Sequence, residues 1–151
     1  MNTRFLEPEF DYVKPATLQD AFSFLKENKN VKVFAGGTDL IVKLKTGGLT
    51  AIDFMMDING IPEMHLFEQT ADGGMRIGAG VKLSAIEQKQ EIISRYPVLS
   101  VAISKMASIS IRNVGTIGGN FCNASPVADT VGPVICYKGL VELTSAEGTR
   151  T

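Results

Sequence analysis

Tryptophan is absent from this sequence of 151 residues, histidine occurs once, at position 65, and there are two cysteines, Cys122 and Cys136. Zinc and iron–sulfur sites need three or four such ligands, so the sequence predicts no metal site. A Ser–His–Asp arrangement would depend on His65, which lies in an alternating apolar run and is predicted to be a satisfied or exposed strand residue. We expect both cysteines to be reduced and partly buried, with a position near a ligand as the alternative for Cys122.

An excess of charge and a long apolar run are also missing. Lys plus Arg number 15 against 16 Asp plus Glu, and no basic cluster occurs, so we expect no nucleic-acid partner. No apolar run approaches the roughly 18 residues that cross a bilayer. Acids and a proline interrupt the first ten residues, which therefore do not resemble a signal peptide. We expect no membrane span and a cytoplasmic location.

Glycine, in contrast, is concentrated in two segments. Residues 35–40, Ala-Gly-Gly-Thr-Asp-Leu, follow a strand-like run at 31–35, and residues 115–120 lie inside the longer stretch 111–129. Glycine permits positive φ and close backbone approach, and successive exposed N–H groups form an anion-binding concavity. The pattern predicts two strand-then-glycine turns that close on one phosphate-bearing ligand. The alternative is two tight turns between strands.

Residue periodicity predicts a mixed α/β chain. Helices are expected over 18–28, 39–45, 85–90, 97–106 and 130–137. Strands are expected over 10–14, 31–35, 52–58, 64–69, 75–79 and 140–144. Caps are expected at Thr17, at Thr38 or Asp39, and at Ser84. Residues 149–151 would begin a partner strand for 140–144, so we expect a truncated or split form of a longer protein.

Few other residues suggest chemistry. Arg112 is a candidate for contact with phosphate, with simple surface exposure as the alternative. Asp129 is a candidate acceptor for ligand hydroxyls or an N-cap of the next segment. No P-loop is present, and Leu83 stands where the dinucleotide fingerprint needs a third glycine. No catalytic side chain is predicted, so difficult chemistry would need a cofactor.

Taken together, the motifs carry a family resemblance. Residues 35–40, Ile111-Arg-Asn-Val-Gly-Thr-Ile-Gly-Gly-Asn120 and Ser125-Pro-Val-Ala-Asp129, with Ile77-Gly-Ala79 between them, closely resemble the FAD-binding (medium) subunit of the molybdenum hydroxylases. That family includes xanthine dehydrogenase and aerobic carbon monoxide dehydrogenase. The resemblance implies a PCMH/vanillyl-alcohol-oxidase-type fold of two α/β subdomains with FAD between them. The subdomains would be 1–59 and 60–151, the second incomplete at its C-terminal end.

The resemblance also implies which residues bind FAD. The first loop around the diphosphate would comprise Val33, Phe34, Ala35, Gly36, Gly37, Thr38, Asp39 and Leu40. The second would comprise Thr116, Ile117, Gly118, Gly119 and Asn120, of which Thr116 and Asn120 would add side-chain hydrogen bonds. Asp129 would contact FAD hydroxyls, and Met106 would lie near the cofactor as an apolar residue.

The implied function is electron transfer in a xanthine dehydrogenase-like complex. A molybdopterin-binding large subunit and a small subunit with 2Fe-2S clusters would deliver electrons to FAD on this chain, which would pass them to NAD or another acceptor. Family subunits continue past the end of this sequence, into a part that helps cover the flavin ring. The alternatives are a truncated module that keeps the fold but binds no flavin, and a stand-alone flavin oxidase.

Overall fold

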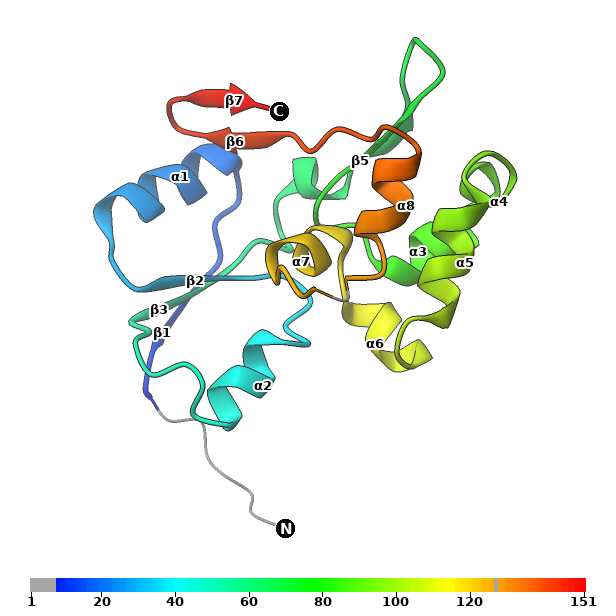
Figure 1. The fold of residues 1–151 in the computed structure, drawn as a ribbon. Helices are drawn as coiled ribbons and strands as arrows, with labels where there is room; N and C mark the ends of the chain where they lie inside the picture. The colour runs from blue at the N-terminus through cyan, green and yellow to red at the C-terminus, as the bar shows by residue number, and fades with distance from the viewer. Residues whose placement is uncertain (1–7, 127) are drawn as a thin grey trace.

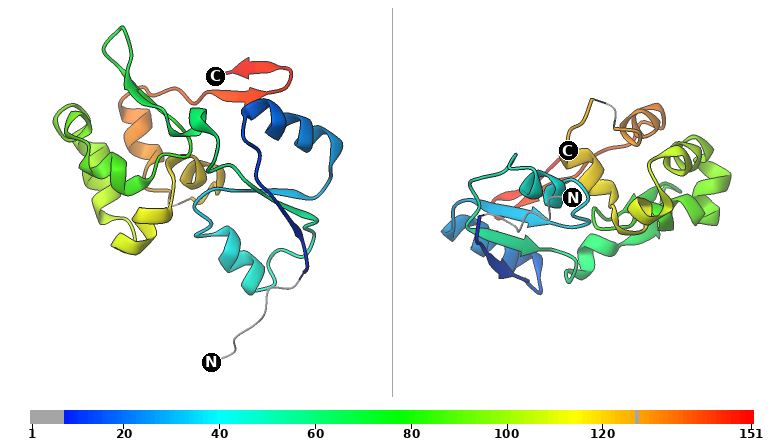
Figure 2. Two further views of the ribbon diagram at one scale, coloured as in Figure 1. Left: turned by 180° about the vertical axis from the view of Figure 1, so that it is seen from behind. Right: turned by 90° about the horizontal axis from the view of Figure 1, so that it is seen from below.

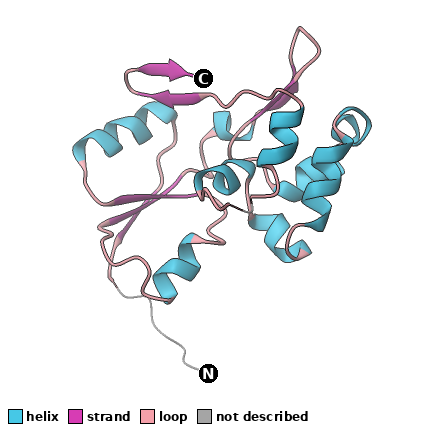
Figure 3. Ribbon diagram, viewed as in Figure 1, coloured by secondary structure: helices cyan, strands magenta, loops and turns pink. Residues whose placement is uncertain are grey.

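The computed structural model describes residues 8–126 and 128–151, and it shows the expected mixture of helices and strands (Figure 3). The strands are β1 (Asp11–Val13), β2 (Val31–Phe34), β3 (Phe54–Asp57), β4 (Phe67–Gln69), β5 (Met75–Ile77), β6 (Leu143–Ser145) and β7 (Gly148–Arg150). The α-helices are α1 (Leu18–Glu27), α2 (Leu40–Lys45), α3 (Leu83–Gln88), α4 (Gln90–Arg95), α5 (Pro97–Lys105), α6 (Ile109–Val114), α7 (Ile117–Cys122) and α8 (Val131–Cys136), and η1 (Pro62–His65) is a 3-10 helix.

The N-terminal part is a small parallel sheet with strand order β1-β3-β2. Parallel sheets are normally covered on both faces, and here α1 lies on one side and α2 on the other (Figures 1 and 2). Successive side chains of a strand point to opposite faces. Met56 on β3 therefore packs in one cluster with Ala21 of α1, while its neighbour Met55 packs in another with Leu44 of α2.

Helix α1 begins where its cap predicts. The Thr17 hydroxyl oxygen accepts a hydrogen bond from the Asp20 N–H at 3.1 Å, and the same hydroxyl donates to the Asp20 carboxylate at 2.7 Å. Such a cap satisfies one of the N–H groups that a helix start leaves without a partner. Asn28 ends the helix in an extended conformation, with φ −118° and ψ 149°. The predicted helix over 18–28 is confirmed to within one residue.

A hydrogen bond between neighbouring strands joins an exposed ring to a buried carboxylate. The Tyr12 hydroxyl on β1 donates to the carboxylate of Asp57, which is 6% exposed. Burial raises the pKa of Asp57, but hydrogen bonds from Tyr12 and Asn59 outweigh burial, so the pKa lies below its ordinary value. The folded state therefore gains stability from Asp57 above the carboxyl's ordinary pKa, and this gain is lost as the pH falls through the lowered value.

We expect Tyr12→Phe to lower the free energy of unfolding by about 1 kcal/mol at neutral pH, because it removes a hydrogen bond to a charged acceptor at a partly exposed site. The difference should shrink as the pH falls through the lowered pKa of Asp57, where the carboxylate is protonated in both proteins. Urea unfolding of both proteins at about pH 7 and in steps below about pH 4 measures this. A difference independent of pH would contradict the assigned role of Asp57.

The second core lies among α3, α4, α5 and α8, which gather on one side of the molecule, and it includes Ile117 of α7 (Figure 1). Ile86, Ile92 and Ile103 are at most 1% exposed and form its centre. Pro97 starts α5 as predicted. The predicted cap at Ser84 is wrong, because α3 begins at Leu83, whose N–H donates to the Gly115 carbonyl at 3.0 Å.

His65 and the two cysteines differ from expectation. His65 ends the short helix η1, because Pro62 starts a helical turn there, and the strand begins only at Phe67. The imidazole Nε2 is nevertheless satisfied, 2.9 Å from the Asn59 carbonyl. Cys122 and Cys136 are unpaired among the described residues, and both are exposed, so the prediction of partial burial is wrong.

The last described element is a hairpin of β6 and β7 in which every residue is exposed. It confirms that residues 149–151 begin a partner strand. Arg76 Nη2 on β5 lies 3.1 Å from the Glu142 carboxylate and ties the start of the hairpin to the preceding sheet. Within the described ranges no helix is long and apolar enough to cross a membrane. The subdomain boundary near Asn59 stays a prediction.

Candidate functional site

The first glycine segment lies at the carboxyl end of the parallel sheet, the usual ligand-binding edge of such sheets. It directly follows β2, as predicted, and Asn59 follows the neighbouring strand β3. The Asn59 side-chain amide donates to the Ala35 carbonyl at 2.9 Å and to Asp57 Oδ1 at 2.6 Å. Asn59 thus fixes the start of the glycine loop, a role that its place in an Asn-Gly turn did not reveal.

The conformation of this loop depends on glycine. Gly37 has φ +71°, and a Cβ there would lie 2.3 Å from Cε2 of the Phe34 ring. In the part of the chain that the structure describes, the N–H groups of Gly36, Gly37 and Thr38 donate to no protein acceptor. Asp39 is the N-cap of α2, as predicted. The loop therefore offers successive free backbone donors, which suit the oxygens of a phosphate.

The second glycine segment is helical, and the predicted strand-then-glycine turn is wrong there. Ser108 caps α6 by accepting from the Ile111 N–H at 3.3 Å, and Thr116 caps α7 by accepting from the Gly119 N–H at 3.0 Å. Each cap is a Ser or Thr that accepts a hydrogen bond from the N–H three residues later. This pattern is the sequence signal for the pair of helices. Gly118-Gly119 forms the first turn of α7 instead of an open loop.

Most N–H groups of this second segment already have partners. Those of Ile117 and Gly118 donate to the carbonyls of Val81 and Ala79 at 3.1 and 2.9 Å, and that of Asn120 donates to the Thr116 carbonyl at 3.0 Å. A Cβ on Gly118 would lie 2.5 Å from the Ala79 Cβ. The segment at 77–79 therefore packs against α7, and the row of successive free backbone donors belongs to the first loop.

The two glycine segments touch each other through their backbones. A Cβ on Gly36 would lie 2.4 Å from the Val114 carbonyl oxygen and 2.8 Å from the Gly115 Cα. A second link joins α2 to the end of α7, where Lys43 Nζ donates to Asn123 Oδ1 at 2.8 Å. Helix α7 accordingly lies between the parallel sheet and the helical half (Figure 1).

The remaining predicted site residues occupy different environments. The buried Thr130 hydroxyl donates to Asn120 Oδ1 at 2.5 Å, which leaves the Asn120 amide group as a donor. Asp129 is exposed, and the N-cap of α8 is Thr130, so the alternative role of Asp129 as that cap is wrong. Met106 and Ile117, each 8% exposed, belong to the helical core. Val127, in the motif 125–129, lies outside the described residues.

Arg112 is neither exposed nor free for phosphate. Its Nε donates to Glu87 Oε2 at 2.7 Å and its Nη1 to the Met106 carbonyl at 2.9 Å. The side chains of Arg112 and Glu87 are only 10% and 20% exposed. The guanidinium therefore joins α3, α6 and the turn after α5, and both predictions for Arg112 are wrong.

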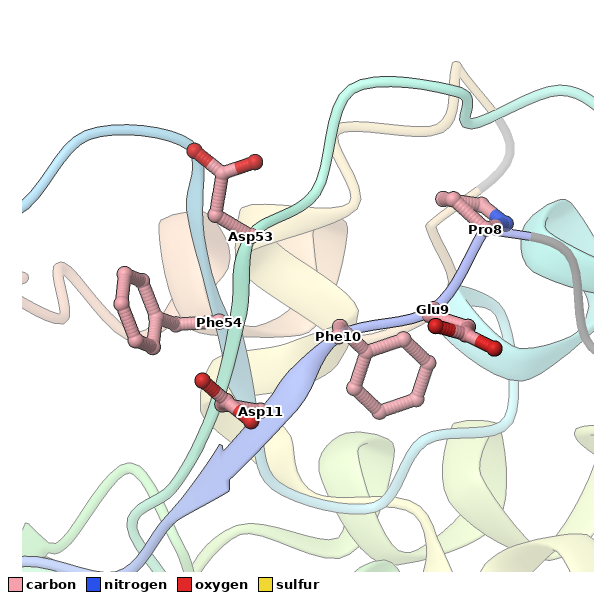
Figure 4. Close-up of a pocket in the computed structure, with 6 residues that line it drawn as sticks. All are labelled: Pro8, Glu9, Phe10, Asp11, Asp53 and Phe54. Atoms are coloured by element: carbon pink, nitrogen blue, oxygen red, sulfur yellow. The ribbon is translucent and has the colours of Figure 1, made fainter.

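An open hollow of about 630 Å³ lies at the opposite edge of the parallel sheet (Figure 4). It is lined by Pro8, Glu9, Phe10, Asp11, Asp53 and Phe54. This is the amino end of β1 and β3, whereas ligands of such sheets bind at the carboxyl ends. Its three carboxylates would also repel an anion. The glycine loops remain the candidate site.

Comparison with known proteins shows the family of the chain. The family described as "FAD binding domain in molybdopterin dehydrogenase" matches residues 8–151. The chain belongs to this family. It is 35% identical over 144 residues to the glyceraldehyde dehydrogenase medium chain of Sulfolobus acidocaldarius, covering 95% of this chain and 50% of the relative. It is 33% identical over 139 residues to the xanthine dehydrogenase FAD-binding subunit of Escherichia coli O157:H7, covering 92% and 47%.

Solved structures confirm the fold of this FAD-binding family. Reconstituted CO dehydrogenase from Oligotropha carboxidovorans superposes with a TM-score of 0.89 at 28% identity, over 97% of this chain and 51% of that one. CO dehydrogenase from Hydrogenophaga pseudoflava gives 0.88 at 27% identity, over 95% and 50%. The chain thus spans about half the length of the relatives it matches. FAD is the cofactor of the family, and the free donors at residues 36–38 fit its diphosphate.

Proposed function

We propose that this chain binds FAD and serves as the flavoprotein part of a xanthine dehydrogenase-like molybdenum hydroxylase. The observation that carries the proposal is the free donor row of Gly36, Gly37 and Thr38, held against the turn between α6 and α7. Bound FAD supplies the capacity to accept and release electrons. The protein's part is to hold the diphosphate at the first loop, with Asn120 and Asp129 as further polar contacts.

The partners form part of the same proposal. A molybdopterin-binding large subunit and an iron–sulfur small subunit would supply the electrons, and NAD or another acceptor would receive them. The proposal is supported by relatives named as the FAD-binding subunit of xanthine dehydrogenase and the medium chain of glyceraldehyde dehydrogenase.

A second candidate function is a module that keeps the fold without holding flavin. One observation favours it. The backbone donors of Ile117, Gly118 and Asn120 are already paired within the protein, so a row of successive free donors occurs in one loop and not in two. A direct measurement of flavin binding separates the two functions.

We expect the purified chain, mixed with FAD, to keep a flavin absorbance spectrum through gel filtration. Gly119→Val should weaken binding at least about tenfold, because the side chain would block backbone approach to the diphosphate. A Cβ at this position would lie 2.9 Å from Thr116 Oγ1, the N-cap oxygen of α7, so that oxygen must shift. Urea unfolding of the flavin-free variant therefore accompanies the binding measurement and separates lost affinity from lost stability. Titration of FAD, followed by quenching of its fluorescence, measures the affinity.

Gly132→Ala is the matched control, because a Cβ at Gly132 meets nothing within 4 Å. It should bind FAD like the parent chain. Loss of flavin from the parent chain on gel filtration would favour the module without flavin. Unchanged affinity in Gly119→Val would remove the second segment from the site.

A further inference from the structure

Lys82 lies where three segments of the site meet. It precedes α3 and forms an isolated antiparallel bridge with Thr116, at the start of α7. Its ammonium group donates to Asn59 Oδ1 and to the Val114 carbonyl, both at 3.1 Å. One side chain therefore joins the segment after β3 to the end of α6.

Asn59 extends this connection to the first glycine loop. Its side-chain Nδ2 donates to the Ala35 carbonyl at 2.9 Å, and its side-chain Oδ1 accepts from Lys82 Nζ. The residues at the two ends of the chain of hydrogen bonds, Ala35 and Val114, immediately precede Gly36 and Gly115. These glycines are the ones whose backbones touch. The Lys82–Asn59 link thus braces the contact between the two glycine segments from one side.

A lysine suits this position for a physical reason. The ammonium group has three donors, and it satisfies two acceptors that come from different parts of the chain. Burial lowers the pKa of Lys82, and the negative charge of Asp57 acts in the opposite direction. A side chain without the ammonium would leave the Asn59 and Val114 oxygens without their donor, which favours separation of the segments.

We infer that Lys82 is a positioning residue for the cofactor: through Asn59 and Val114 it holds the first glycine loop against the turn between α6 and α7. The inference rests on the proposed binding of FAD between these segments. It assigns to Lys82 no contact with the reacting part of the flavin. Lys82 raises the fraction of protein molecules in which the two segments are correctly placed for one diphosphate, and the apparent affinity for FAD rises with that fraction.

The test compares Lys82→Met with Lys105→Met, which removes the same charge from an exposed position in the last turn of α5. We expect Lys82→Met to weaken FAD binding at least about tenfold and Lys105→Met to leave it unchanged. Lys82→Arg, which keeps a charged donor, should recover most of the affinity. Far-UV circular dichroism and urea unfolding of the flavin-free variants show whether any of them has lost stability. Recovery of affinity in Lys82→Arg among variants of equal stability then points to the charged donor.

Asn59→Ala breaks the same link from its other end and serves as the second variant if Lys82→Met does not fold. It should weaken FAD binding by a similar factor, and the double variant should bind no more weakly than the weaker single one. Folded Lys82→Met or Asn59→Ala that binds FAD as tightly as Lys105→Met would overturn the inference. Failure of the parent chain to bind FAD would instead overturn the proposed function, so the two failures are distinct.

Discussion

Replacing Gly36 with alanine is expected to push the two glycine segments apart and to weaken FAD binding at least about tenfold. The added Cβ would lie 2.4 Å from the Val114 carbonyl oxygen and 2.8 Å from the Gly115 Cα. Both neighbours are backbone atoms, so no side-chain rotation relieves the overlap. Forcing extra volume into a packed contact costs about 1–3 kcal/mol, and we expect a loss near the upper end.

Denaturant unfolding of the flavin-free chain and fluorescence titration with FAD measure the two effects of Gly36→Ala. Gly48→Ala is the matched control, because its Cβ would meet the Lys43 carbonyl oxygen at an ordinary 3.6 Å. The control should change neither quantity appreciably. Gly36→Ala with full affinity for FAD would show that the contact between the segments is unimportant for the cofactor.

Replacing Glu87 with alanine should cost about 3 kcal/mol of unfolding free energy, because it leaves the Arg112 guanidinium buried without its counter-ion. Arg112 is 8% exposed and cannot turn to solvent without disturbing its bond to the Met106 carbonyl. Helices α3 and α6 should loosen together, since the pair connects them. Urea unfolding gives the free energy, and hydrogen exchange of the two helices gives the location.

Glu91→Ala provides the comparison for Glu87→Ala. Glu91 lies 3.8 Å from Lys89, and the two side chains are 50% and 40% exposed. Exposed pairs of this kind contribute about 0–1 kcal/mol, so its removal should be close to neutral. Equal losses from the two variants would mean that Arg112 finds another way to be solvated.

The features that sequence analysis predicted correctly depend on neighbouring residues. The Thr17 cap and Pro97 at a helix start act within one turn of chain, and their residue types are sufficient to place them. The first glycine loop was predicted because an apolar strand leads directly into Gly36-Gly37. The resemblance to FAD-binding subunits added the family, because it combined motifs that are individually weak.

The features that were missed depend on residues far apart in the sequence. Glycine disfavours helices, yet Gly118-Gly119 is helical because Thr116 caps the turn and Ala79 packs where a side chain would stand. The Arg112–Glu87 pair spans 25 residues, and the Lys82–Asn59 bond spans 23. No periodicity or short motif connects such partners, so only the tertiary structure shows them.

The central place of β3 determines the order in which the N-terminal sheet can be completed during synthesis. Both β1 and β2 pair with β3, which follows them in the chain. Until Phe54–Asp57 has left the ribosome, the two earlier strands have no partner in this sheet, and the apolar side of α1 lacks Met56 beneath it. This sheet can therefore be completed, and both of its faces covered, only after its central strand has been made.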